Sequence, residues 1–271
     1  ETMYLMSSPQ YSFLSSSGVK EVATFGGSVV DWPAFPDSAA ALARLHDRFR
    51  LGVITNCDDD LFAVQCDVTD SDAVDAAFKQ VEEHQGSVEV LVANAGVAAD
   101  AFLMRMTVEK FEKVIDANLT GAFLASRAAL PELVRTKGSI VTISSDSGLR
   151  AGPRSAAYCT AKAGLIMLTQ CIALDYGPQG VRANCICPGW VRTPMADGEM
   201  DELGELRGAD RDGAYELVSS RVPLRRPGSP GEIAAAVAWL ASEGAGFTTG
   251  AVIAIDGGNS VVDSSSMEFA V

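Results

Sequence analysis

The 271-residue sequence is poor in the residues that bind metals and nucleic acids. It has two histidines, His46 and His84, and none of its six cysteines forms a Cys-x-x-Cys pair. Zinc sites need closely spaced ligands of these types, so we expect no metal site. Lys and Arg number 21 against 35 Asp and Glu, which gives a formal net charge of -14. Nucleic acids and anionic membranes attract basic surfaces, so neither is expected as a partner.

Long apolar runs and a signal-peptide pattern are also missing. No run approaches the roughly 18 apolar residues of a membrane span. The Ser-rich start, Glu1–Ser17, has no basic segment before an apolar one, unlike a secretory signal. The cysteines at positions 57, 66, 159, 171, 185 and 187 are expected to be free, buried thiols in a reducing compartment. We therefore predict a cytoplasmic protein.

The sequence instead alternates short β-branched runs with amphipathic stretches rich in Ala and Leu. The expected strands are Val22–Phe25, Leu51–Thr55, Phe62–Cys66, Val88–Ala93, Ser139–Ser144, Arg182–Cys187 and Ala251–Ile255. The expected helices are Asp37–Phe49, Asp70–His84, Val108–Arg135, Ser155–Tyr176, Asp201–Val218 and Pro230–Ser242. Alternating strands and helices imply crossover connections and a doubly wound, parallel α/β sheet in one domain over residues 19–262, with tails at 1–18 and 263–271.

Three polar residues point to proton-transfer chemistry. Tyr158 and Lys162 lie four residues apart in one predicted helix, so they share a face. An ammonium group there favours the phenolate and is expected to lower the Tyr158 pKa towards neutrality. Ser145 follows a predicted strand, 13 residues before Tyr158, and strand ends face the ligand crevice in such sheets. Its hydroxyl could hold a carbonyl oxygen that the tyrosine protonates.

Further polar and small residues follow the other predicted strands. They are Asp67-Val68, Asn94-Ala95-Gly96, Pro188-Gly189 with Val191 and Thr193, and Asp256-Gly257-Gly258. Small residues at strand ends let the backbone approach a cofactor closely. Asn118 lies inside a predicted helix, where it is either functional or marks a kink or a cap.

These motifs together resemble the short-chain dehydrogenase/reductase family, and over residues 62–260 most closely its 3-oxoacyl-[acyl-carrier-protein] reductase branch. The resemblance implies a three-layer Rossmann-like fold and an enzyme that interconverts a ketone and a secondary alcohol with NAD or NADP. It implies that Tyr158 is the general acid, that Lys162 lowers its pKa and holds the nicotinamide ribose, and that Ser145 polarises the carbonyl. Asn118 would hold a water of a proton relay.

The resemblance also assigns the cofactor contacts. Asp67, Val68, Asn94, Ala95 and Gly96 would line the adenosine side, and Pro188, Gly189, Val191 and Thr193 the nicotinamide and pyrophosphate side. The Met195–Val222 segment would be a substrate lid, with a functionless insertion as the alternative. A homotetramer is implied as well.

The N-terminal part departs from this pattern. The family's glycine-rich turn is expected near residues 17–27, where only Gly26 and Gly27 follow a plausible strand. Val29 to Trp32 would crowd a diphosphate, and Asp31 would repel it. Segment Val22–Ala63 instead resembles pieces of haloacid-dehalogenase-type hydrolases, including Thr55-Asn56, but without that family's nucleophilic Asp.

Three interpretations therefore stay open: a reductase, a reductase-like scaffold with impaired cofactor binding that acts as a binding or oligomer partner, and a hydrolase. The acidic run Asp58-Asp59-Asp60 after the second strand favours NAD, because carboxylates bond a ribose diol and repel a 2′-phosphate. The reductase branch often uses NADP, so the two indications disagree. The substrate is expected to be a small carbonyl or alcohol compound.

Overall fold

A computed structural model describes residues 2–6, 51–55 and 63–263 of the chain. The strands are β1 (Thr2–Met6), β2 (Leu51–Thr55), β3 (Ala63–Gln65), β4 (Val90–Ala93), β5 (Ser139–Ile143), β6 (Arg182–Pro188) and β7 (Val252–Ile255). The longer helices are α3 (Ser71–Gln85), α4 (Val108–Ile115), α5 (Gly121–Thr136), α6 (Ala156–Tyr176), α7 (Pro194–Arg207), α8 (Arg211–Ser219) and α9 (Pro230–Ala241). Every strand expected from Leu51 onward is confirmed. The strand Val22–Phe25 and the helix Asp37–Phe49 lie outside the described residues.

The strands form one sheet in the order β3-β2-β1-β4-β5-β6-β7. β4 to β7 pair in parallel, as do β2 and β3. β1 lies between β2 and β4 and runs antiparallel to both. The prediction of an N-terminal tail over residues 1–18 is therefore wrong at Thr2–Met6, because this apolar run fills a central place in the sheet by backbone pairing.

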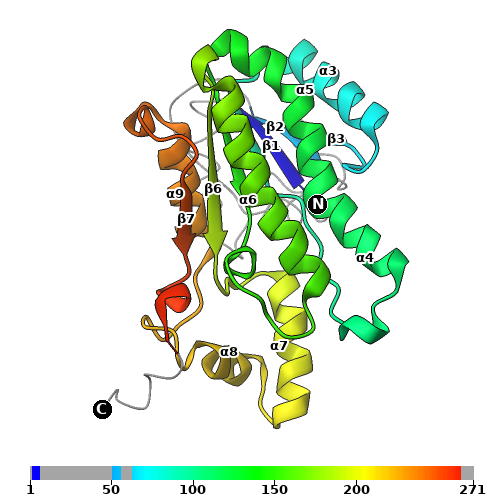
Figure 1. The fold of residues 1–271 in the computed structure, drawn as a ribbon, viewed down its shortest axis with the longest axis vertical. Coiled ribbons are helices and arrows are strands. Elements are labelled where there is room, and N and C mark those ends of the chain that lie inside the picture. Colours follow the sequence, from blue (N-terminus) through cyan, green and yellow to red (C-terminus); the bar gives the residue numbers. More distant parts are fainter. Residues whose placement is uncertain (1, 7–50, 56–62, 264–271) are drawn as a thin grey trace, which may run out of the picture.

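Helices cover both faces of the sheet, as the doubly wound prediction requires (Figure 1). On one face, Leu91 and Ile140 pack with residues of α3, α5 and α6, including Phe78 and Leu133. On the other face, neighbouring strand residues such as Val141 pack against α9. Burial of both faces explains why these strands are almost wholly apolar.

The predicted helix Val108–Arg135 is present, but its α-helical hydrogen-bond pattern is interrupted once. Between α4 and α5 the chain makes one π-helical turn, η3 (Asp116–Thr120), with Asn118 in its centre. Short π-helical turns interrupt α-helices mostly at functional sites. The Asn118 amide donates to the carbonyl of Val114 four residues earlier at 2.8 Å, which helps to hold this turn.

The charged, glycine-rich segment Met195–Val222 contains a pair of helices in place of the predicted single helix Asp201–Val218. α7 begins at Pro194, with Thr193 as its N-cap, and the chain breaks between the two helices at Gly208, whose φ is 70°. α7 and α8 pack around the buried Met200 and Tyr215. In Figure 1 this pair lies beyond the ends of β6 and β7, apart from the layers that cover the sheet.

Helix α6 and the turn after it, Ala156–Gln179, are long and apolar enough by composition to cross a membrane. In the structure this helix packs on the sheet, with Leu165 and Ile172 buried, so it is a core helix. The predicted free thiols are buried at Cys66, Cys185 and Cys187. Within the described residues Cys171 is exposed and Cys159 is half-buried, so the prediction of burial is wrong for these two.

Candidate active site

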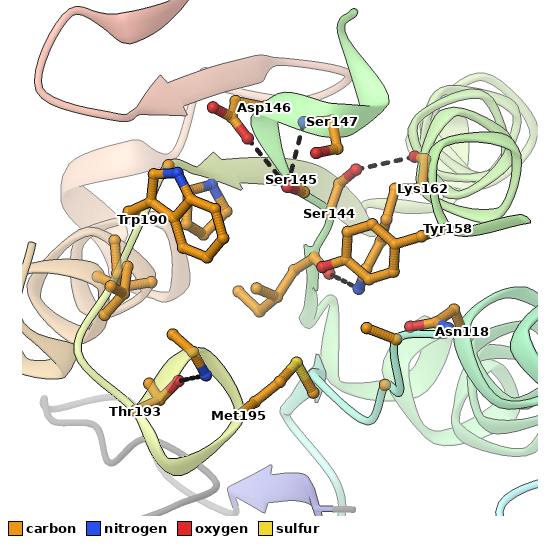
Figure 2. A pocket seen from close by; sticks show the side chains of 18 of the residues that line it. Asn118, Ser144, Ser145, Asp146, Ser147, Tyr158, Lys162, Trp190, Thr193 and Met195 are labelled. Carbon is orange, nitrogen blue, oxygen red and sulfur yellow. Dashed lines mark hydrogen bonds between the residues drawn. The ribbon is translucent and has the colours of Figure 1, made fainter. Parts of the chain in front are cut away.

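A cavity of about 580 Å³ lies where the carboxyl ends of β4, β5 and β6 meet α6, α7 and α9. Ligand pockets typically enclose about 300–1,000 Å³, and the strand ends of an open α/β sheet are their usual place. Ten residues predicted from the sequence line it, namely Asn94, Gly96, Asn118, Ser145, Tyr158, Lys162, Pro188, Gly189, Val191 and Thr193. Figure 2 shows Ser145, Tyr158 and Lys162 close together on one side of this cavity.

Ser145 lies two residues after the end of β5 and caps the short helix η4 (Asp146–Gly148). Its Oγ accepts a hydrogen bond from the Ser147 N–H at 3.1 Å and donates one to Asp146 Oδ1 at 3.1 Å. The residue is nearly buried, at 9% exposure. The hydroxyl is thus held by its own turn at the wall of the cavity.

Tyr158 and Lys162 face the cavity from the first turns of α6, as their spacing predicts. The Lys162 side chain is buried, its Nζ lies 5.5 Å from the centre of the Tyr158 ring, and it donates to the Ile143 carbonyl at 2.9 Å. Ser144 Oγ donates to the Lys162 carbonyl at 2.8 Å and so ties the helix to the end of β5. The ammonium group is therefore fixed below the tyrosine ring.

The pKa of Tyr158 moves in the opposite direction to the sequence-based expectation. Burial raises it to about 12, and the Ser145 hydroxyl only partly offsets this by favouring the phenolate. The carboxylates of Glu199 and Asp146 contribute to this rise. The prediction of a lowered pKa is thus wrong for the chain alone, because desolvation of the phenolate outweighs the stabilisation that a neighbouring cation could provide.

Asn118 is fully buried and joins the loop after β4 to the π-helical turn. Its amide donates to the Val97 carbonyl at 2.8 Å, and its Oδ1 accepts from the Val97 N–H at 3.3 Å. A Cβ at Gly96 would lie 2.4 Å from Asn118 Oδ1 and 3.4 Å from Lys162 Nζ. Only glycine permits this close approach of the backbone to the two side chains. Gly96, Asn118 and Lys162 therefore pack tightly together as one wall of the cavity.

The turn after β6 supplies the opposite wall. Gly189 lies against Asp256 of the turn after β7, where a Cβ would approach the Asp256 Cβ to 2.9 Å. Thr193 Oγ1 accepts from the Ala196 N–H at 3.3 Å and caps α7. The predicted turn at Asp256-Gly257-Gly258 is confirmed, with φ values of 65° at Gly257 and 92° at Gly258.

Some predicted cofactor residues are not brought into this cavity. Asp67 is exposed and its carboxylate accepts from the N–H and the hydroxyl of Thr69 at 2.9 and 2.8 Å, which lowers its pKa. Val68 is buried against Gly121. Ala95 packs against the core. Gly26 and Gly27, like the acidic run Asp58-Asp59-Asp60, lie outside the described residues.

Four acidic or amide residues of the cavity were not identified from the sequence: Asp100, Asp146, Glu199 and Asn259. Asp146 directly follows Ser145, and Asn259 directly follows the quoted glycine turn, so adjacency to a motif could have found both. Nothing in the sequence separates Asp100 or Glu199 from ordinary surface acids. Among the residues that the structure describes, no three His, Cys, Asp or Glu side chains gather as metal ligands.

A phenol and a hydroxyl that share one cavity with a fixed ammonium group can bind and protonate a carbonyl oxygen. Together with the doubly wound sheet, this set is that of a carbonyl-reducing or alcohol-oxidising enzyme of the Rossmann-like α/β class. A family model described as enoyl-(acyl carrier protein) reductase, of the short-chain alcohol dehydrogenase type, matches residues 41–260. The chain belongs to the short-chain dehydrogenase/reductase family and is an oxidoreductase.

Individual relatives agree with this assignment. The chain is 48% identical over 199 residues to the 3-oxoacyl-[acyl-carrier-protein] reductase MabA of Mycobacterium tuberculosis, covering 73% of this chain and 76% of the relative. It is 38% identical to the 3-oxoacyl-[acyl-carrier-protein] reductase FabG of Staphylococcus aureus, covering 73% and 77%. The ligand-free aldohexose dehydrogenase of Thermoplasma acidophilum has a similar structure, with a TM-score of 0.73 and 34% identity over 78% of this chain and 84% of that one.

The comparisons do not support the resemblance to haloacid-dehalogenase-type hydrolases. The match to the family model begins at residue 41, inside the segment Val22–Ala63 that carried this resemblance. Strand β2 takes part in the same sheet as the rest of the domain and pairs in parallel with β3. Strand β2, which ends at Thr55, is thus part of the same sheet as the other described strands, and short β-strand motifs of this kind occur in many α/β folds.

Proposed function

We propose that the protein is an NAD(P)(H)-dependent oxidoreductase that interconverts 3-oxoacyl thioesters and the corresponding 3-hydroxyacyl thioesters. The observation that carries this proposal is the convergence of Ser145, Tyr158 and Lys162 on one cavity at the carboxyl ends of the strands. The names of MabA and FabG indicate the substrate class. The alternative is a reductase-like scaffold with impaired cofactor binding that acts as a binding or oligomer partner.

In the proposed reaction the substrate carbonyl oxygen accepts hydrogen bonds from the hydroxyls of Ser145 and Tyr158. A nicotinamide dinucleotide supplies the hydride when it is bound. Tyr158 Oη transfers its proton to the oxygen as negative charge develops there, and the high pKa of the phenol keeps it protonated before reaction. The fixed ammonium of Lys162 then stabilises the phenolate that remains. Alcohol oxidation runs through the same groups in reverse.

The cavity fits the nicotinamide half of the cofactor. The lack of a side chain at Gly96 and Gly189 brings the backbone to the cavity wall at two places, and both residues line it together with Asn94 and Thr193. We assign these four residues and Pro188, Val191, Tyr158 and Lys162 to cofactor binding. The adenosine half falls to Asp67, Val68 and Ala95, with Gly26 and Gly27 at the pyrophosphate.

For the choice between the two cofactors we propose NAD. The acidic run Asp58-Asp59-Asp60 follows the second strand, β2, by three residues. Carboxylates at this position of a Rossmann-like fold bond the ribose diol and repel a 2′-phosphate.

Part of the cavity lining suits an uncharged acyl group. Trp190, Met195, Ile233 and Val237 give the cavity apolar surface on the side of α7 and α9.

We further propose a cytoplasmic homotetramer. Phe123 on α5 and Met167 and Leu174 on α6 are exposed at 44%, 59% and 78%, which is surface that a second copy would cover.

The test has two parts. NADH and NADPH are first titrated against the intrinsic fluorescence of the three tryptophans, and we expect saturable binding that is tighter for NADH. A 3-oxoacyl thioester and an enoyl thioester of equal chain length are then compared as substrates. We expect reduction of the 3-oxoacyl compound. Absence of binding for either nucleotide would favour the scaffold alternative, and exclusive reduction of the enoyl compound would overturn the substrate assignment.

A further inference from the structure

One side of α7 faces the cavity, and it carries a carboxyl group. Met195, Ala196 and Glu199 all line the cavity, and their spacing of three to four residues places them on one side of an α-helix. Met200, the next residue, is buried between α7 and α8. Glu199 itself is half-buried. The helix therefore holds a carboxylate at the wall of the cavity.

Glu199 differs from the two aspartates of α7, which have partners on α8. Asp197 accepts the Tyr215 hydroxyl at 2.8 Å and lies 3.4 Å from Arg211 Nη1. Asp201 lies 2.7 Å from Arg211 Nη2. Among the residues that the structure describes, none forms a hydrogen bond or an ion pair with the Glu199 carboxylate. This carboxylate is thus left for a ligand in the cavity.

The groups around Glu199 do not compensate its charge. Its pKa is raised to about 7, mainly by burial and in smaller part by the charges of Asp100 and Glu202. Asp100 lies on the loop after β4 and lines the cavity as well. The charge of Glu199 in turn contributes to the raised pKa of Tyr158, so the two groups lie within electrostatic reach of each other. This side of the cavity is therefore negative once Glu199 is ionised.

Two of the described lining residues are cations, and both are engaged elsewhere. Lys162 Nζ donates to a backbone carbonyl at the end of β5 at 2.9 Å. Arg150 Nη2 lies 3.9 Å from Asp146 Oδ2, so its charge is balanced within its own turn. Figure 2 shows Asp146 and Met195 of α7 on opposite sides of the cavity. A substrate carboxylate near α7 would thus meet Glu199 without a compensating cation.

A half-buried carboxylate without a partner favours some ligands over others. Two like charges brought together away from bulk water repel each other strongly. An amide N–H or a hydroxyl instead donates a hydrogen bond to the carboxylate, and such charge-assisted bonds are stronger than neutral ones. Glu199 therefore distinguishes ligands by their charge, within reach of the phenol that protonates the carbonyl.

We propose that Glu199 is a specificity-determining residue that excludes substrates with a carboxylate beside the reacting ketone and accepts neutral acyl derivatives in their place. In a 3-oxo compound the carboxyl carbon is two bonds from the ketone carbon, so both groups are held in the same part of the cavity. A free 3-oxo acid is an anion there, whereas its thioester and its amide are neutral. This inference rests on the proposed carbonyl reduction and explains why a thioester is reduced in preference to the free acid.

The test uses two compounds of equal size, 3-oxobutanamide and 3-oxobutanoate, which differ by one charge. Their kcat/KM values are measured in the wild type, in Glu199→Gln and in the control Glu205→Gln, whose position on the same helix is exposed. We expect the wild type to favour the amide, and Glu199→Gln to lower the amide-to-carboxylate ratio by about tenfold, because one like-charge repulsion is removed. The control keeps the wild-type ratio. Both compounds use the same phenol, so the ratio cancels any effect of the variant on Tyr158.

The pH dependence of this ratio tests the same carboxyl group. As pH falls from about 8 to about 6, Glu199 becomes protonated while the substrate carboxylate stays ionised. We expect the wild-type ratio to fall over this range and the ratio in Glu199→Gln to stay constant. A wild-type ratio in Glu199→Gln, or an equal fall of the ratio in Glu205→Gln, would overturn the proposal.

A binding measurement separates this inference from the proposed function. Trp190 lines the cavity, so its fluorescence, obtained by subtracting the signal of Trp190→Phe, reports binding without turnover. With NAD present, which cannot reduce a ketone, we expect 3-oxobutanamide to bind more tightly than 3-oxobutanoate in the wild type and about equally in Glu199→Gln. If no 3-oxo compound is reduced while this difference is seen, the proposed function fails and the role of Glu199 stands. Equal affinities of the wild type for the two compounds would contradict that role.

Discussion

The side chain of Glu199 on α7 allows a quantitative prediction about stability. It lines the cavity, and its pKa is raised from the ordinary value of 4.5 to about 7, mainly by burial and in smaller part by the charges of Asp100 and Glu202. A carboxyl whose pKa is higher in the folded state than in the unfolded state favours folding while it is protonated. Its ionisation costs stability as pH rises from about 4.5, and the full cost is present above about pH 7.

The magnitude follows from the difference between the two pKa values. A rise from 4.5 to about 7 corresponds to at most about 3.4 kcal/mol at 1.36 kcal/mol for each pKa unit. Glu199 is half-buried, so solvent screening reduces this to about 1–2 kcal/mol. Gln mimics the protonated carboxyl. We therefore expect Glu199→Gln to be more stable than the wild type by about 1–2 kcal/mol at pH 8, and equally stable below pH 4.5.

Urea unfolding of both proteins across this pH range measures the difference. Glu205→Gln, on an exposed position of the same helix, is the matched control and should show no comparable pH-dependent gain. A difference between Glu199→Gln and the wild type that stays constant with pH, or that grows towards acid, would refute the reasoning. Either result would mean that the Glu199 carboxyl does not lose its hydration when the protein folds.

Three other substitutions test separate parts of the structure. Tyr158→Phe removes the proton donor and should abolish ketone reduction in a spectrophotometric assay while nucleotide affinity, measured by fluorescence, stays nearly intact; full activity would refute the assignment. Gly96→Ala places a Cβ 2.4 Å from Asn118 Oδ1 and should lower the free energy of unfolding by about 2–3 kcal/mol through overpacking and lost hydrogen bonds. The control Gly177→Ala, whose Cβ would meet no atom within 4 Å, should not lower it. Equal melting temperatures for the two variants would contradict this prediction. Ser229→Ala removes the capping box of α9 and should lower stability by about 1 kcal/mol, and an unchanged urea midpoint would show that the cap does not matter.

The capping box of α9 shows what local sequence can predict. Ser229 and Glu232 bond each other's backbone within one turn, so four consecutive residues contain the whole interaction. The spacing of Tyr158 and Lys162 is equally local, because any α-helix places residues four apart on one face. The apolar strands were found for a similar reason, since a run buried on both faces needs no information about its neighbours.

The errors of prediction concern residues whose roles depend on distant neighbours. The break between α7 and α8 depends on how the two helices pack around Met200 and Tyr215. The π-helical turn at Asn118 is held in part by bonds to Val97, 21 residues away. Strand β1 is placed by pairing with strands about 50 and 90 residues further along the chain, which no local pattern reveals.

By itself the sequence determined the class of fold, the positions of its strands along the chain from Leu51 onward, and the residue types that carry the chemistry, because these follow from local periodicity and short motifs. Only the tertiary structure decided the electrostatics of the site. Burial by several elements raises the Tyr158 pKa to about 12, and Asn259 reaches Asp146 across 113 residues of sequence. Desolvation and hydrogen bonding between strand ends depend on positions in space, and the chain acquires those positions only when the sheet forms.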